Sequence, residues 1–213
     1  MKRSYLLVVL MTLACVVCSN AVKADTTQIA IATFANPSQI ASDWLFKVDF
    51  VNMKFTAGWP DSKTGLTLQI SYSGHVFYDA WFSMTDVVLI SNGGINGNSQ
   101  GGPGTISFFE NGTSSNPLLV IDFQSCELNR YGAGADEYFI LDNVVFGGSE
   151  ISDSLSDEQF SFSFTSLAKL NNNWNNGFTA AGSFSSSAVI PEPATLALLT
   201  LGMSVIFIGN KKG

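Results

Sequence analysis

A strict alternation of apolar and polar residues runs through the middle of this 213-residue chain. Successive side chains of a β-strand point to opposite faces of a sheet, so a period of two assigns one face to the core and the other to water. The clearest segments are 44–50 (WLFKVDF), 66–72 (LTLQISY) and 160–165 (FSFSFT). We expect their apolar members to face the core: Trp44, Phe46, Val48, Phe50, Leu66, Leu68, Ile70, Tyr72, Phe160, Phe162 and Phe164.

Seven further segments have the composition of strands and are separated by turn residues such as Asn111-Gly112 and Gly147-Gly148. They are TTQIAIATF, VFYDAWFSM, DVVLIS, TISFFE, PLLVIDF, EYFILDNVVF and GFTAAGSF. No long stretch of the sequence has the 3.6-residue period of an amphipathic helix. The pattern therefore predicts an all-β fold for residues 25–188, which we expect to be an antiparallel β-sandwich of jelly-roll type.

The charge of this region excludes one class of partner. Between residues 25 and 190 there are 16 acidic and five basic residues, a net charge of −11. Such a field repels phosphate backbones, so we expect no nucleic-acid partner. Cys126 is the one cysteine of the region, which leaves a buried small apolar residue or a thiol for intermolecular pairing as its two interpretations.

The first 24 residues have the three parts of a secretory signal peptide. Lys2 and Arg3 precede a 14-residue apolar segment, residues 5–18. That segment is shorter than the roughly 20 residues needed to span a bilayer. A small-residue cleavage site follows, so we expect cleavage between Ala24 and Asp25.

The last 25 residues, 189–213, differ in composition from the rest. Residues 194–209 carry no formal charge, and as a helix they would extend about 24 Å. Two prolines precede this run and Lys211 and Lys212 follow it, which favours the cytoplasmic side for the final residues. We expect 194–209 to be a transmembrane helix that holds an exported chain in the inner membrane during transit.

This terminal segment resembles the PEP-CTERM sorting signal of Gram-negative bacteria. The matching residues are the tripeptide Pro191, Glu192 and Pro193, the hydrophobic run with Leu196, Leu198, Leu199 and Gly202, and the basic end Lys211 and Lys212. The resemblance covers the tail and the signal peptide only. It implies export through a secretion translocon, recognition by exosortase at the tripeptide, and delivery to the cell surface or the extracellular matrix.

Catalytic signals in the remaining sequence are weak, and we assign no catalytic residue. The sequence GNSQG around Ser99 fits G-x-S-x-G, but its glycine-rich surroundings exclude the helix that must follow a nucleophile elbow. His75, the only histidine, follows Gly74 and is expected in an exposed turn. Carboxylates for a glycosidase, the enzymatic alternative, are Asp79, Glu110, Asp122 and Asp142.

The sequence predicts no cofactor, and its metal signals are limited to one segment. No histidine or cysteine cluster exists for zinc, and the calcium loop of an EF-hand is absent. The segment GGSEISDSLSDEQF gathers Glu150, Asp153, Asp157 and Glu158. These are hard oxygen ligands, so the segment is either a solvated linker or a calcium site.

Three tryptophans are candidates for stacking on sugar rings: Trp59, Trp81 and Trp174 lie in polar or turn-rich contexts. The glycine-rich segment 91–104 is expected to be a connector. Together these features indicate an exported, non-enzymatic protein of the cell surface or biofilm matrix that binds polysaccharide. The alternatives are a small jelly-roll glycoside hydrolase and an ice- or mineral-surface binder, which needs a flat array of Thr or Asx that no sequence repeat provides.

Overall fold

Antiparallel strands make up most of the described part of the chain, which in this computed structural model is residues 28–35, 44–58, 65–136 and 144–190. The strands are β1 (Gln28–Ala35), β2 (Phe46–Asp49), β3 (Lys54–Ala57), β4 (Leu66–Ile70), β5 (His75–Met84), β6 (Val87–Val88), β7 (Ser99–Gly101), β8 (Gly104–Phe109), β9 (Leu119–Phe123), β10 (Cys126–Asn129), β11 (Gly132–Asp136), β12 (Val145–Gly147), β13 (Ser156–Lys169) and β14 (Gly177–Val189). Two short 3-10 helices, η1 (Leu170–Asn172) and η2 (Trp174–Asn176), join β13 to β14, and the described residues contain no α-helix. The all-β prediction is confirmed.

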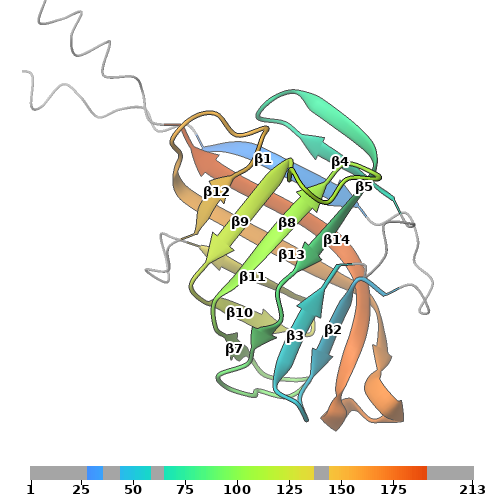
Figure 1. Cartoon of the computed structure of the whole chain (residues 1–213). Helices are drawn as coiled ribbons and strands as arrows, with labels where there is room; N and C mark the ends of the chain where they lie inside the picture. Colours follow the sequence, from blue (N-terminus) through green and yellow to red (C-terminus); the bar gives the residue numbers. More distant parts are fainter. Residues whose placement is uncertain (1–27, 36–43, 59–64, 137–143, 191–213) are drawn as a thin grey trace, which may run out of the picture. The chain divides into compact units, whose positions relative to one another are not determined.

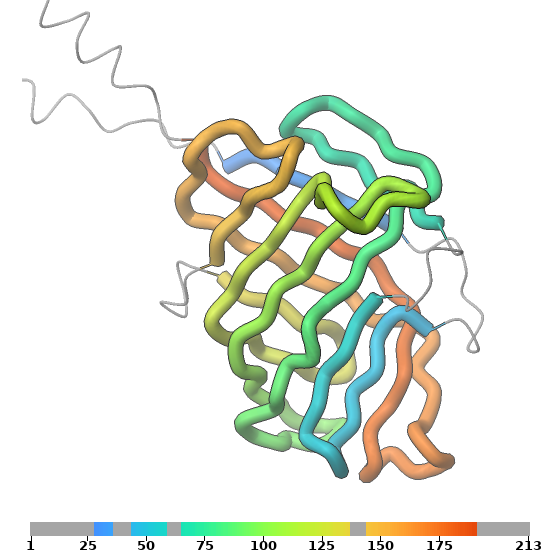
Figure 2. Tube along the Cα trace, in the orientation of Figure 1, coloured from blue at the N-terminus to red at the C-terminus, as the bar shows by residue number. Residues whose placement is uncertain are grey.

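The strands form one curled sheet in which every pairing is antiparallel. The order is β12-β9-β8-β5-β4-β1-β14-β13-β11-β10-β7, while β2 pairs with β14 and β3, and β3 with β6. The sheet curls at the long strand β5, because the first half of β5 pairs with β4 and its second half pairs with β8. As a result β9, β8 and β5 cross in front of β14, β13 and β11 (Figures 1 and 2).

Phenylalanine rings from both halves of the sheet fill the space between them. Phe162 of β13 contacts Phe46 of β2 at a ring-centroid distance of 4.9 Å, and Phe108 of β8 contacts Phe184 of β14 at 5.0 Å. Aromatic pairs of this kind add about 0.5–1.5 kcal/mol each beyond the apolar area that they bury. The alternation predicted the positions 46, 48, 50, 66, 68, 70, 160, 162 and 164, all of which are buried. Cys126 is buried as well.

Two expectations about the interior and the loops are wrong. Trp44 is 36% exposed and Leu45 is fully buried instead, because β2 begins only at Phe46 and the alternation does not extend back beyond it. The segment 91–104 is not only a connector, since Ser99–Gly101 forms β7 and pairs with β10.

Several sequence predictions lie outside the described residues. They concern the cleavage site at Ala24 and Asp25, Trp59, Asp142, the tripeptide Pro191, Glu192 and Pro193, and the apolar segment 194–209. Within the described ranges, the longest helical segments are single 3-10 turns, and none has the length and hydropathy to cross a bilayer.

A buried serine repairs a defect in the pairing of β1 with β14. Ala30 and Ala32 are register partners of adjacent β14 residues, so Ile31 is an inserted residue and β1 bulges there. The hydroxyl of Ser186, which is only 5% exposed, accepts a hydrogen bond from the Ala32 amide and donates one to the Ala32 carbonyl, both at 3.1 Å. Both polar groups of the bulged backbone are therefore satisfied by one side chain.

We expect Ser186→Ala to lower the free energy of unfolding by about 1–3 kcal/mol, because it leaves a buried amide and a buried carbonyl without this partner. The measurement is the midpoint and slope of urea-induced unfolding. Ser185→Ala is the matched control: it removes the same hydroxyl from the next, exposed position and should change stability by less than about 0.5 kcal/mol. Equal effects of the two substitutions would show that Ser186 has no special role at the bulge.

Candidate functional site

The outer face of β1, β14 and β13 is covered by hydroxyl and amide side chains. The same alternation that buries the phenylalanines turns the intervening residues outward: Gln28, Thr33, Gln159, Ser161, Ser163, Ser183, Ser185 and Ser187, which we call the serine face. Strand register aligns them across the sheet, since Ser161 lies opposite Ser185 and Ser163 opposite Ser183. The result is an uncharged polar surface several strands wide.

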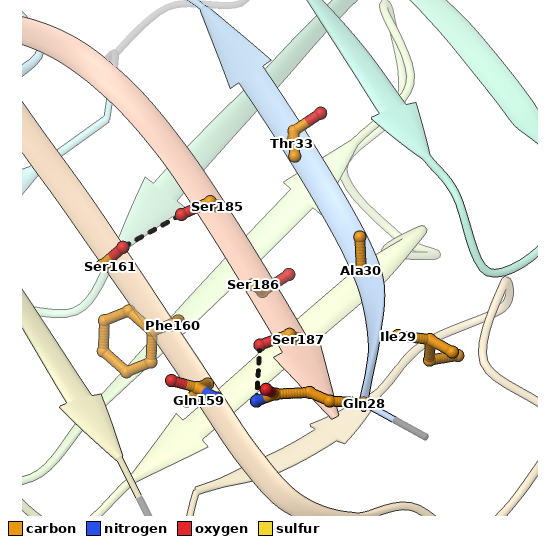
Figure 3. Close-up of a pocket in the computed structure, with 10 residues that line it drawn as sticks. All are labelled: Gln28, Ile29, Ala30, Thr33, Gln159, Phe160, Ser161, Ser185, Ser186 and Ser187. Carbon is orange, nitrogen blue, oxygen red and sulfur yellow. Dashed lines mark hydrogen bonds between the residues drawn. The ribbon is translucent and has the colours of Figure 1, made fainter. Parts of the chain in front are cut away.

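A shallow depression of about 320 Å³ lies on this serine face (Figure 3). None of the described residues that line it carries a charged side chain. Ser161 and Ser185 share a hydrogen bond of 3.0 Å between their hydroxyls, and the Gln28 amide donates to the Ser187 hydroxyl at 3.2 Å. These side chains retain further donor and acceptor capacity, because a hydroxyl can donate once and accept twice.

A second depression of about 410 Å³, which we call the trough, adjoins the first along β13 and shares Gln159 and Ser161 with it. Its floor is the backbone of β11 at Gly132 and Gly134. A Cβ atom at either glycine would collide with a carbonyl oxygen of β13, so the close approach of the two strands requires glycine at both positions. The same requirement leaves the floor without side chains.

Tyr131 stands at one end of the trough and is 67% exposed. Its backbone amide donates to the Asn129 side chain at 2.9 Å, and its hydroxyl accepts a hydrogen bond from Arg130. The Arg130 guanidinium lies 4.8 Å from the ring centroid and donates to Asn96 at 3.2 Å. The ring is thus held in place by Arg130 and Asn129 while it lines the trough and stays largely exposed to solvent.

Sequence reasoning missed Tyr131 as a site residue. The available signal was an aromatic residue in NRYG, between a charged residue and a glycine, which is typical of an exposed turn. Glu127 and Asp136, which also line the trough, were not among the predicted carboxylates.

The two predicted stacking tryptophans within the described ranges are half-buried. Trp81 stacks on Phe109 at 4.5 Å and donates its indole N–H to the Thr113 carbonyl at 3.1 Å. Trp174 packs against the core and has the Lys169 ammonium 5.8 Å from its ring centroid. Neither lines the serine face or the trough, so their contact with sugars stays a prediction.

The other residues considered for catalysis have structural roles or lie apart. Ser99 is fully buried and accepts a hydrogen bond from the Gly93 amide at 3.0 Å. Asp122 accepts one from Thr105 across the β8–β9 pair. Asp79 lies in β5 and Glu110 follows β8, and neither lines the serine face or the trough.

No protein-family model, curated protein or solved structure matches this chain. The site therefore has to be interpreted from its own geometry.

The predicted calcium segment is tied to the β4–β5 turn. Glu150 Oε2 lies 2.7 Å from His75 Nδ1, and the Tyr72 hydroxyl donates to Asp153 at 2.5 Å. His75 is exposed, as expected, but it is the first residue of β5 and does not lie in the turn itself. Among the described residues, no three His, Cys, Asp or Glu side chains converge as a metal site.

A third depression, of about 420 Å³, lies on the β2–β3 hairpin, and its charges are already paired. Lys54 bonds Asp86 at 2.9 Å, and Lys47 lies 3.6 Å from Asp49. Burial by itself raises the pKa of Asp49, but two hydrogen bonds from Asn52 and the charge of Lys47 lower it overall. We interpret this hairpin as a structural ion-pair network, because its charges are matched internally.

Burial by itself also raises the pKa of Glu150, but the hydroxyl of Ser73, which is placed without a geometric hydrogen bond, and the hydrogen bond and charge of His75 lower this pKa below its ordinary value. A carboxylate with a lowered pKa stabilises the fold above its unfolded-state pKa and loses that contribution as the pH falls through the folded-state pKa.

We therefore expect Glu150→Gln to be most destabilising above about pH 4.5, with the difference from the parent chain narrowing as the pH falls below that value. Urea unfolding at pH 6 and at pH 3 measures this difference. The companion variant His75→Gln should raise the pKa of Glu150, which a carboxyl NMR titration reports. A difference between parent and Glu150→Gln that stays constant with pH would contradict the ionised contact.

Proposed function

We propose that this chain is an exported, non-enzymatic protein of the cell surface or extracellular matrix that binds polysaccharide through the serine face and the trough. The proposal includes a jelly-roll arrangement of the sandwich, a cleaved signal peptide at residues 1–24 and a PEP-CTERM sorting signal at 189–213 with its transmembrane segment 194–209. Its partners are then the secretion translocon, exosortase, the inner membrane during transit, and extracellular polysaccharide.

The binding proposal rests on one observation: the serine face and the trough adjoin each other, and their chemical groups complement one another. The serine face offers hydroxyl and amide groups without charge, and the trough adds one exposed aromatic ring at its end. A polysaccharide presents the matching groups, because its ring edges carry hydroxyls and its C–H faces stack on aromatic rings. Neighbouring strands are spaced about 4.8 Å apart, which is close to the length of one pyranose residue in an extended chain.

The same face bears on the ice- or mineral-binding alternative. Strand register aligns hydroxyl groups of β13 with those of β14, although the sequence shows no repeat. Its aligned pairs across β13 and β14 are Ser161 with Ser185, Ser163 with Ser183 and Gln159 with Ser187, and none of these residues has the methyl group that a threonine array would present. We therefore favour a ligand that replaces water through hydrogen bonds, which is a polysaccharide.

One observation favours the glycoside hydrolase as a second candidate. Glu127 pairs with Gly134 across β10 and β11, and Asp136 follows two residues later on the same face. The backbone positions of diagonal neighbours of this kind are about 7–8 Å apart, which allows their carboxyl groups to reach the separation of about 6.5–9.5 Å that inverting glycosidases use. Release of reducing ends that disappears in Glu127→Gln would establish the hydrolase; binding without release would support the non-enzymatic proposal.

Tyr131→Ala should weaken binding of short β-1,4-linked glucose, N-acetylglucosamine or glucosamine oligosaccharides by about tenfold, because an exposed ring at a binding site contributes more than about 1 kcal/mol. Isothermal titration calorimetry on the full chain in detergent measures the affinity. Tyr78→Ala is the matched control, since Tyr78 is also strongly exposed but lies on β5, four strands from β13 in the sheet order. Equal losses in both variants, or none in Tyr131→Ala, would remove the trough from the proposal.

The sorting proposal has a separate test. Intact-mass analysis of the protein released from the cell surface should give a chain that begins at Asp25 and ends near Pro191-Glu192-Pro193. Replacing the tripeptide by alanines should leave residues 194–209 attached to the released or membrane-bound protein. A mature surface protein that still carries this apolar segment would contradict processing at the tripeptide.

A further inference from the structure

Four asparagines of the chain directly precede a glycine: Asn92, Asn96, Asn111 and Asn176. All four pairs lie in the part of the chain that the structure describes. Asparagine before glycine is prone to lose its side-chain amide by reaction with its own main chain, because glycine has no side chain that hinders the attack and its backbone rotates freely. The local sequence treats the four pairs alike, so the fold decides which of them reacts.

Three of the four pairs are packed against other backbone. A Cβ atom added at Gly93, Gly97 or Gly177 would lie within 2.4 Å of a backbone carbonyl oxygen. Two of these glycine amides are also engaged, since Gly93 donates to the buried Ser99 hydroxyl at 3.0 Å and Gly177 donates to the Trp174 carbonyl. Reaction at these pairs therefore requires the main chain to move against packed atoms and, at two of them, to give up a hydrogen bond.

The pair Asn111-Gly112 has neither restraint. Asn111, Gly112 and Thr113 are all exposed, in the segment that joins β8 to β9. A Cβ atom added at Gly112 would meet nothing within 4 Å. The Thr113 amide donates to the Glu110 carbonyl at 3.1 Å and closes a tight turn around the pair, but neither the Asn111 side chain nor the Gly112 amide forms a hydrogen bond with another described residue. The Gly112 nitrogen is thus free to approach the Asn111 side chain.

The geometry points to Asn111 as a self-modification site, where the folded protein converts this asparagine to aspartate and isoaspartate. The Gly112 nitrogen attacks the side-chain carbonyl carbon of Asn111 and loses its proton. A five-membered succinimide ring forms as the bond from that carbon to the side-chain nitrogen breaks and ammonia leaves. Water then opens the ring at one of its two carbonyl groups, and the choice of carbonyl gives aspartate or isoaspartate. Water is the one co-reactant, and the inference does not depend on polysaccharide binding.

The conversion changes the turn in two ways. It places a new carboxylate next to Glu110, and in isoaspartate it adds the side-chain methylene carbon of residue 111 to the main chain. The indole N–H of Trp81 donates to the Thr113 carbonyl in the same turn at 3.1 Å. Modification of Asn111 therefore alters the surroundings of Trp81, one of the tryptophans predicted to stack on sugars.

The experiment follows all four pairs in one sample. The full chain in detergent is incubated at about pH 8, and mass spectrometry of its peptides records the increase of about 1 Da that each conversion causes. We expect Asn111 to convert at least about tenfold faster than Asn92, Asn96 or Asn176 in the folded chain, which corresponds to a difference of about 1.4 kcal/mol in the barrier. In concentrated urea this preference should disappear, because the packing and the hydrogen bonds that restrain the other pairs are lost.

Two variants test the assignment. Asn111→Gln should abolish the early increase in mass, because the longer side chain has to form a less favoured six-membered ring. Asn96→Gln is the matched control: it changes another exposed asparagine that precedes glycine and should leave the increase in place. Enzymatic methylation of isoaspartate should label the incubated parent chain at residue 111.

Faster conversion at any of the other three pairs would overturn the assignment to Asn111. A tenfold preference that persists in urea would attribute the selectivity to local sequence and overturn the role of the fold. Aspartate without isoaspartate would indicate direct hydrolysis of the side chain and overturn the attack by Gly112.

Discussion

The packing of phenylalanine rings between the two halves of one curled sheet is the constraint on which the other features depend. Phe46, Phe82, Phe162 and Phe184 come from β2, β5, β13 and β14, so the contact holds only if the sheet folds back on itself. Since each strand has two faces, filling the inner face with aromatic rings commits the intervening residues to the surface. The serine face is therefore the outer side of the same pattern that builds the core, and the alignment of its hydroxyl groups follows from the pairing of β13 with β14.

Local patterning predicted the strands whose own residues favour β-structure, and it missed those that depend on their neighbours. The phenylalanines of β13 and the aliphatic residues of β4 alternate so regularly that their burial follows from sequence. By contrast, β10 and β11 are built from CELN and GAGAD, which have little β-propensity and become strands through pairing with β13 and with each other. The trough could not be predicted for the same reason: it exists only once register places Glu127 beside Gly134, and Gly134 beside Ser161.

Gly132 and Gly134 connect this packing to the proposed site. Their hydrogen atoms lie where a side chain would meet the Phe162 and Phe160 carbonyls, so β11 can join β13 in this register only with glycine. The chain therefore obtains an uncovered strip of backbone, bordered by the longer side chains of β10 and β13, as a by-product of strand pairing. Tyr131 immediately precedes this strip, so the β10–β11 turn places the aromatic ring at the end of the strip without any further element.

The distribution of charged and neutral side chains indicates how this surface can bind a ligand. Covering a charged side chain with a ligand costs several kcal/mol of desolvation unless a partner compensates it, while covering a hydroxyl costs less. On the serine face each hydroxyl exchanges water for a ligand group with a net gain of about 0.5–1.5 kcal/mol at most. No single contact is then decisive, and affinity has to accumulate over repeated contacts along several strands. Such a surface suits a polymer better than a small molecule, because a polymer can contact the hydroxyl groups of β1, β14 and β13 at the same time.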